Sequence, residues 1–196
     1  MLHLEQRPEP STAMLYAAPI LAVVLTLFAS LVLFALLGKD PLQAIRLIFI
    51  EPLLSKKSFS ELIVKATPLI LIALGLAAGF REGVWNIGAE GQFVMGALAG
   101  GTVALAAYPM DAVWLLPLMC LAGVAGGMAW AAIPALLKTR FNANEILVSL
   151  MLVYVATLLL SVLVHGPLKD PEGANFPESR LFQASAAMPI LMAGTR

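Results

Sequence analysis

A short polar stretch between two long apolar runs holds the side chains best placed to do chemistry. Residues 85–92 read WNIGAEGQ and include two amides, Asn86 and Gln92, and one carboxylate, Glu90. Hydrocarbon offers no partner to a peptide N–H or a carboxylate, so such a segment must line a cavity or face protein or water. Amides and a carboxylate beside free backbone N–H groups at a helix start suit the hydroxyls of a sugar.

Structural interpretations of the same stretch compete with a role in binding. Asn86 can cap the following helix, while Glu90 complements the helix dipole or pairs with Arg81. Trp85 is either an anchor at the membrane surface or an aromatic face for a sugar or base. The structural and the binding roles are compatible with one another.

Other catalytic or metal-binding patterns are absent from the sequence. The only Gly-Lys pair, Gly38-Lys39, runs into Asp40 and is not a nucleotide-binding loop of the G-x-x-x-x-G-K-[ST] form. His3 and His165 lie far apart in the sequence, and no Ser or Cys stands in a nucleophile motif. The sequence therefore predicts no catalytic residue, no metal site and no cofactor.

The composition predicts an integral membrane protein. Hydrophobic residues make up 60% of the chain and charged residues 12%, about half the roughly 25% of soluble domains. The formal net charge is +0, which argues against nucleic acid as a partner. The one cysteine, Cys120, excludes a disulfide within the chain.

The elements that must position the polar stretch are apolar helices. A transmembrane helix needs about 20 predominantly apolar residues, and the chain offers five such runs. We expect an all-α, polytopic transmembrane bundle forming a single transmembrane domain over residues 1–196. Residues 42–54 form an amphipathic segment on the membrane surface or a soluble cap on the bundle. The expected spans are 14–37, 62–80, 91–108, 112–137 and 146–164.

Pairs of small residues at helical spacing recur in three of these spans. Such pairs let helix backbones approach closely, and packing alone is enough to explain them. They are Gly75/Gly79, Gly96/Gly100 and Gly123/Gly127.

The turn expected at residues 138–145 sets the orientation. It is short and carries Lys138 and Arg140 ahead of its first acid, Glu145, which is typical of a cytoplasmic loop. With five spans, this places the N-terminus in the cytoplasm. A simple count of basic residues favours the opposite orientation, but most of those residues lie in longer loops, where the rule is weaker.

Two longer strings carry a resemblance to a known family. Residues 80–92 read FREGVWNIGAEGQ and residues 139–154 read TRFNANEILVSLMLVY. Together they resemble permease subunits of ABC importers for nucleosides and simple sugars, the branched-chain amino acid and ribose type of permease. The resemblance covers nearly the whole chain, and the WNIGAEGQ string is its most specific part.

What the resemblance implies is a multi-pass subunit of a prokaryotic plasma membrane. Its expected partners are an ABC ATPase subunit, a second permease subunit, an extracytoplasmic binding protein and the lipid bilayer. Asn144 and Glu145 would open a helix that faces the cytoplasm and its partners, although an ordinary capped helix start explains them too. The residues expected near the substrate pathway are Trp85, Asn86, Gly88, Glu90, Gly91 and Gln92.

The family's members are about twice as long, so the chain is expected to be the N-terminal half of a permease. A truncated product, a split permease and an incompletely predicted gene all agree with this. A membrane scaffold, an assembly subunit or an inactive permease fragment is the competing function, and a membrane enzyme lacks a catalytic set. Nucleosides are the first expected substrates, and pentoses or hexoses the second.

Overall fold

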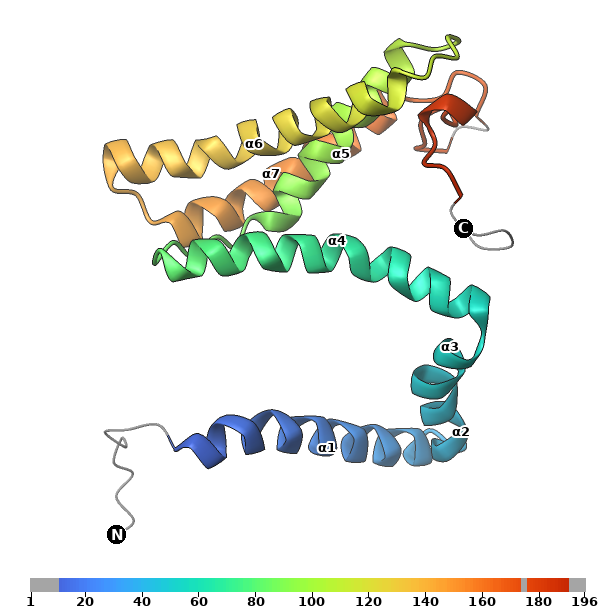
Figure 1. Cartoon of the computed structure of the whole chain (residues 1–196), viewed down its shortest axis with the longest axis vertical. Coiled ribbons are helices and arrows are strands. Elements are labelled where there is room, and N and C mark those ends of the chain that lie inside the picture. Colours follow the sequence, from blue (N-terminus) through green and yellow to red (C-terminus); the bar gives the residue numbers. More distant parts are fainter. Residues whose placement is uncertain (1–10, 174–175, 191–196) are drawn as a thin grey trace. The chain divides into compact units, whose positions relative to one another are not determined.

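The computed structural model describes residues 11–173 and 176–190, and every regular element in them is helical. The expected all-α class is confirmed (Figure 1). A π-helix, η1, covers Arg46–Ile50, and a 3₁₀ turn, η2, covers Ala184–Ala186. The α-helices are α1 Thr12–Leu36, α2 Pro41–Ile45, α3 Glu51–Leu54, α4 Lys56–Arg81, α5 Ala89–Ala106, α6 Leu115–Phe141 and α7 Glu145–His165.

The chain divides within α4, after Val64, into two compact units. In the first unit α1 is followed by a turn in which Gly38 adopts a φ of 67°. Asp40 caps α2, because its Oδ1 accepts hydrogen bonds from the N–H groups of Leu42 and Gln43 at 3.0 and 3.2 Å. The segment expected to be amphipathic, residues 42–54, consists of three consecutive short helical pieces, α2, η1 and α3.

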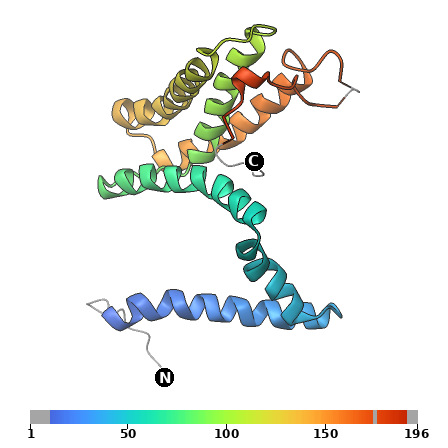
Figure 2. The ribbon, with the colours of Figure 1, turned by 45° about the vertical axis from the view of Figure 1, so that its right-hand side comes forward.

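In the second unit α5 packs against both α6 and α7 (Figures 1 and 2). The contact with α6 is a backbone contact. A Cβ atom added at Gly96 would lie 2.9 Å from the carbonyl oxygen of Gly123, and one at Gly100 would lie 2.9 Å from that of Met119. Glycine is required at both positions because any side chain would push the two helices apart.

The segment after α7 packs against the C-terminal end of α5 and the N-terminal end of α6. Ala186 of η2 is buried against Ala104 of α5 and Leu115 of α6. Ser185 Oγ donates a hydrogen bond to Asp111 Oδ1 at 2.8 Å, which joins η2 to the loop between α5 and α6. These contacts place the α5–α6 loop and the segment after α7 at the same end of the helix group.

Four helices of the described residues are long and apolar enough to cross a membrane: α1, α4, α6 and α7. The expected span 91–108 forms α5, which has 18 residues and begins with the polar Glu90 and Gln92. At about 1.5 Å per residue it reaches roughly 27 Å, slightly less than a hydrocarbon core of about 30 Å. The count of five crossings stays a prediction.

The polar turn expected at 138–145 is shorter in the structure. Helix α6 continues through Lys138 and Arg140, whose positive charges suit the C-terminal end of a helix dipole. Asn142 ends the helix with a φ of 52°, and the N–H of Ala143 donates to the carbonyl of Leu137 at 3.2 Å. The turn between α6 and α7 is thus reduced to residues 142–144, which we call the α6–α7 turn.

Candidate functional site

The loop between α4 and α5 starts with a tight reversal at the end of α4. The N–H of Val84 donates to the carbonyl of Gly79 at 3.0 Å, and Gly83 supplies the positive φ of 75° that the turn requires. The rings of Phe80 and Trp85 then lie with their centroids 5.0 Å apart. This reversal leads the chain from α4 directly into residues 85–92.

Ser149 of α7 holds the middle of that loop. Its Oγ accepts a hydrogen bond from the N–H of Ile87 at 3.2 Å and donates one to the carbonyl of Ile146 at 3.2 Å. Gly88 packs directly on it, since an added Cβ would lie 2.9 Å from Ser149 Cβ. Ser149 was not among the expected site residues, and the sequence marks it only as the first hydroxyl residue of the apolar run after Asn144, ahead of Tyr154, Thr157 and Ser161.

Asn86 and Gln92 form an amide pair across the start of α5. Asn86 Nδ2 donates to Gln92 Oε1 at 3.3 Å, and the N–H of Gly88 donates to Asn86 Oδ1 at 2.8 Å. The N-cap of α5 is Gly88, without a side-chain cap. Asn86 therefore binds the backbone of the N-cap residue and is not itself the cap that one interpretation expected.

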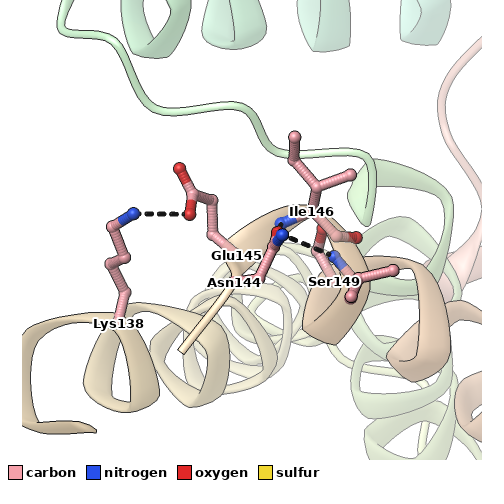
Figure 3. A network of polar contacts seen from close by, with 6 residues as sticks. Lys138, Asn144, Glu145, Ile146 and Ser149 are labelled. Atoms are coloured by element: carbon pink, nitrogen blue, oxygen red, sulfur yellow. Dashed lines mark hydrogen bonds and ion pairs between the residues drawn. The ribbon is translucent and has the colours of Figure 1, made fainter. Parts of the chain in front are cut away.

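One side of the amide pair borders a cavity of about 210 Å³, which we call the α6–α7 cavity. Ala131 and Pro134 of α6 form part of its apolar wall. Figure 3 shows the ammonium of Lys138 pointing at the carboxylate of Glu145, 2.6 Å away. The polar side chains along the cavity are Asn86, Gln92, Lys138, Thr139, Glu145 and Ser149.

The other side of the pair borders a second cavity of about 360 Å³, which we call the α4–α5 cavity. Asn86 and Gln92 are its polar side chains. Its apolar wall comes from α4 and from the first turns of α5, and consists of Ile72, Gly75, Leu76, Ala89 and Phe93.

Asn144 and Glu145 lie at the start of α7. Asn144 Oδ1 accepts from the N–H groups of Ile146 and Leu147 at 3.0 and 3.3 Å, which makes Asn144 the helix cap that the sequence indicates (Figure 3). Glu145 is in the first turn, where its charge also suits the helix dipole.

Gly91 lies where α5 crosses α7. It is buried, and an added Cβ would lie 3.0 Å from Cα of Val153 and 3.4 Å from Nε1 of Trp130. Trp130 Nε1 is itself buried without a hydrogen-bond partner in the part of the chain that the structure describes. Gly91 therefore packs helices together and does not border either cavity.

The remaining residues expected at the pathway are more exposed. Trp85 and Glu90 are both exposed, and Glu90 forms no ion pair with Arg81 among the described residues. That pairing, one of the structural interpretations of Glu90, is therefore not what holds it. Neither residue lines the two cavities.

The three glycine pairs have different surroundings. Gly96, Gly100, Gly123 and Gly127 lie at the α5–α6 contact, where Gly127 faces the carbonyl of Gln92. In α4, a Cβ added at Gly75 would meet nothing within 4 Å, and one at Gly79 would make an ordinary 3.5 Å contact with the Val84 carbonyl. Residues 11–173 and 176–190 contain no group of three His, Cys, Asp or Glu side chains placed to hold a metal ion.

Comparison with known proteins identifies a family and several relatives. The family described as the permease component of the branched-chain amino acid transport system matches residues 58–194. The glucose ABC transporter permease protein TsgB13 of Haloferax volcanii is 41% identical over 190 residues, which cover 97% of this chain and 50% of the relative. No solved structure matches.

Two further relatives are named for other substrates. The guanosine ABC transporter permease protein NupP of Bacillus subtilis is 37% identical over 110 residues, or 56% of this chain and 31% of NupP. The nucleoside ABC transporter permease protein NupB of Lactococcus lactis is 26% identical over 148 residues, or 76% of this chain and 41% of NupB. The chain spans half or less of the length of each of these three relatives.

Proposed function

Because the chain belongs to the family of permease components of branched-chain amino acid transport systems, we propose that it forms part of the translocation path of an ABC importer. The family and the four long apolar helices make it a multi-pass membrane protein. The proposed cargo is a nucleoside or a simple sugar, in line with the glucose, guanosine and nucleoside permeases that it resembles.

The observation that carries the proposed cargo is the amide pair Asn86–Gln92 with a cavity on each side. Amides offer a donor and an acceptor without a net charge, which matches a hydroxyl group better than it matches an ion. The hydroxyl of Ser149 beside one cavity is already bonded to Ile87 and Ile146, and the charges of Lys138 and Glu145 neutralise each other at the edge of that cavity. Such a site favours a neutral, hydroxylated solute.

The pathway residues have separate roles in this proposal. Asn86 and Gln92 contact the solute, while Gly88 and Gly91 let the loop and α5 lie against α7. Glu90 and Trp85 are exposed beside the pair and meet the solute or the rest of the transporter.

The proposed partners are those expected of such a permease. They are an ABC ATPase that supplies the energy, a second permease subunit, and a binding protein that delivers the solute from outside. The membrane is the plasma membrane of a prokaryote, and the N-terminus faces the cytoplasm. The α6–α7 turn, which includes Asn144, and the first residue of α7, Glu145, then lie on the side of the ATPase.

The test is transport by the complete permease that carries this chain, reconstituted in vesicles with its cognate ATPase and binding protein. We expect ATP-dependent accumulation of radiolabelled glucose or radiolabelled guanosine. The matched control is the same complex with an ATPase variant that binds ATP without hydrolysing it. If no sugar or nucleoside accumulates with ATP, the permease function is rejected and a scaffold role takes its place.

The proposed orientation gives a separate prediction, made in a Cys120→Ser background because Cys120 is exposed. A cysteine at Thr139, near the end of α6, reacts with an impermeant thiol reagent from the cytoplasmic side. A cysteine at Gly173, beyond the 21 residues of α7, reacts only from outside. Helix α7 is about 31 Å long, enough to separate the two positions by a bilayer. Labelling with the sides exchanged would reverse the orientation, and labelling from one side alone would remove α7 from the spans.

A further inference from the structure

The two cavities on either side of residues 85–92 share a wall. Asn86 and Gln92 line both the α6–α7 cavity and the α4–α5 cavity. Among residues 11–173 and 176–190, no other residue lines both. The amide pair is therefore the polar part of the partition between a space beside α4 and a space beside α6 and α7.

One hydrogen bond holds the pair together. The N–H of Gly88 donates a hydrogen bond to Asn86 Oδ1 at 2.8 Å. This bond fixes the amide so that its Nδ2 group faces Gln92. Gln92 must then present its oxygen, and the Nδ2 to Oε1 distance is 3.3 Å. This bond is longer than the usual 2.9 to 3.0 Å of an N–H···O hydrogen bond, so it is the weaker of the two.

Breaking that bond leaves one donor, Asn86 Nδ2, and one acceptor, Gln92 Oε1. A hydroxyl group satisfies both at once, because it accepts from the Nδ2 group and donates to the oxygen. A cation or an anion satisfies only one of the two. The backbone bond from Gly88 is unaffected, so Asn86 stays anchored while the pair separates.

We propose that the Asn86–Gln92 pair is a hydroxyl-binding gate between the two cavities, opened when a hydroxyl of a neutral solute replaces the amide-to-amide bond. This proposal rests on the proposed function and assigns to one pair of residues the recognition of the cargo. Solute that has entered one cavity passes between the two amides to the other through this exchange. A solute without hydroxyl groups leaves the gate closed.

The test places a cysteine in each cavity, one per variant, in the complete importer with Cys120→Ser. Gly75→Cys probes the α4–α5 cavity, where an added Cβ meets no atom within 4 Å, and Ala131→Cys probes the α6–α7 cavity. A small neutral thiol reagent is added from one side of the vesicles. With the pair intact, we expect one of the two cysteines to react at least tenfold faster than the other.

Opening the gate is expected to raise the reaction rate of the slower cysteine and to leave the rate of the faster one unchanged. Gln92→Ala raises its rate at least tenfold, and so does glucose or guanosine, whichever the importer transports. Gln92→Leu, which removes the acceptor but keeps much of the bulk, serves where Gln92→Ala does not fold. Thr102→Ala is the matched control, because Thr102 is on the same helix and lines neither cavity.

Equal rates for the two cysteines with the pair intact, or a slow rate that neither Gln92 variant changes, overturn the gate. Because labelling does not require transport, these results are distinct from failure of the proposed function. Loss of ATP-dependent uptake in the unmodified importer would reject the transport role, even if the two cysteines still reacted at different rates.

Discussion

Replacing Glu90 with glutamine is expected to lower substrate uptake by more than tenfold in the proposed complete importer, while the amount of protein in the membrane stays within twofold. Glu90 is exposed in the first turn of α5 and forms no ion pair with Arg81 among the described residues. Its contribution to the helix dipole is about 0.3–1 kcal/mol, too little to unfold the protein. Hydrogen bonds from a solute to a charged group contribute about 1.5–3 kcal/mol, and each 1.4 kcal/mol is a factor of about ten.

The measurement is the initial rate of uptake, normalised to the permease detected in the vesicles. Glu82→Gln is the matched control, since Glu82 is an exposed acid of the same loop that lies before Trp85 and outside the expected pathway. A role confined to the helix end would appear as reduced protein with normal uptake per molecule. Normal uptake together with normal abundance would remove Glu90 from the pathway.

Adding methyl groups at the α5–α6 contact is expected to have a large effect on stability. We expect the double substitution Gly96→Ala and Gly100→Ala to lower the free energy of unfolding by at least about 2 kcal/mol, the scale of overpacking at a close contact. Each added Cβ would lie 2.9 Å from a backbone carbonyl oxygen of α6, which has no rotamer with which to move away. Thermal unfolding of the detergent-solubilised protein measures the change.

Gly75→Ala with Gly79→Ala is the control for this prediction, because both pairs have the same spacing and gain the same helix propensity. A Cβ at Gly75 meets nothing, and one at Gly79 makes an ordinary contact. Alanine is favoured over glycine in a helix by up to about 1 kcal/mol per residue, so the control is expected to be as stable as the parent or more so. Equal losses in the two double variants would show that the α5–α6 contact does not depend on its glycines.

These glycine pairs also mark how far the sequence predicts the fold. Long apolar runs locate the helices, because a bilayer accepts few other structures. The small-residue pairs look alike in the sequence, yet Gly96 has the Gly123 backbone against it and Gly75 has open space. Which face of a helix is covered depends on its neighbours, and the spacing within one helix does not contain that information.

In the candidate site, too, the sequence indicates which residues are polar but not which distant residues they contact. The amides and the carboxylate of residues 85–92 stand out in the sequence because they interrupt an apolar region. The link from Ile87 to Ser149 joins residues 62 positions apart, so no local pattern indicates it. Helix α6 extends into the expected turn as far as Phe141 and ends only at Asn142, which adopts a left-handed conformation that glycine more often supplies.

The Ser149 link has a mechanical consequence. The backbone N–H of Ile87 is hydrogen-bonded to Ser149 of α7. The first residue of α7, Glu145, forms an ion pair with Lys138 of α6. The loop that carries Asn86 and the α6–α7 turn are therefore both attached to the first two turns of α7. We therefore expect a displacement of that turn to reach Asn86 and Gln92 through one turn of α7 and the Ser149 hydrogen bond.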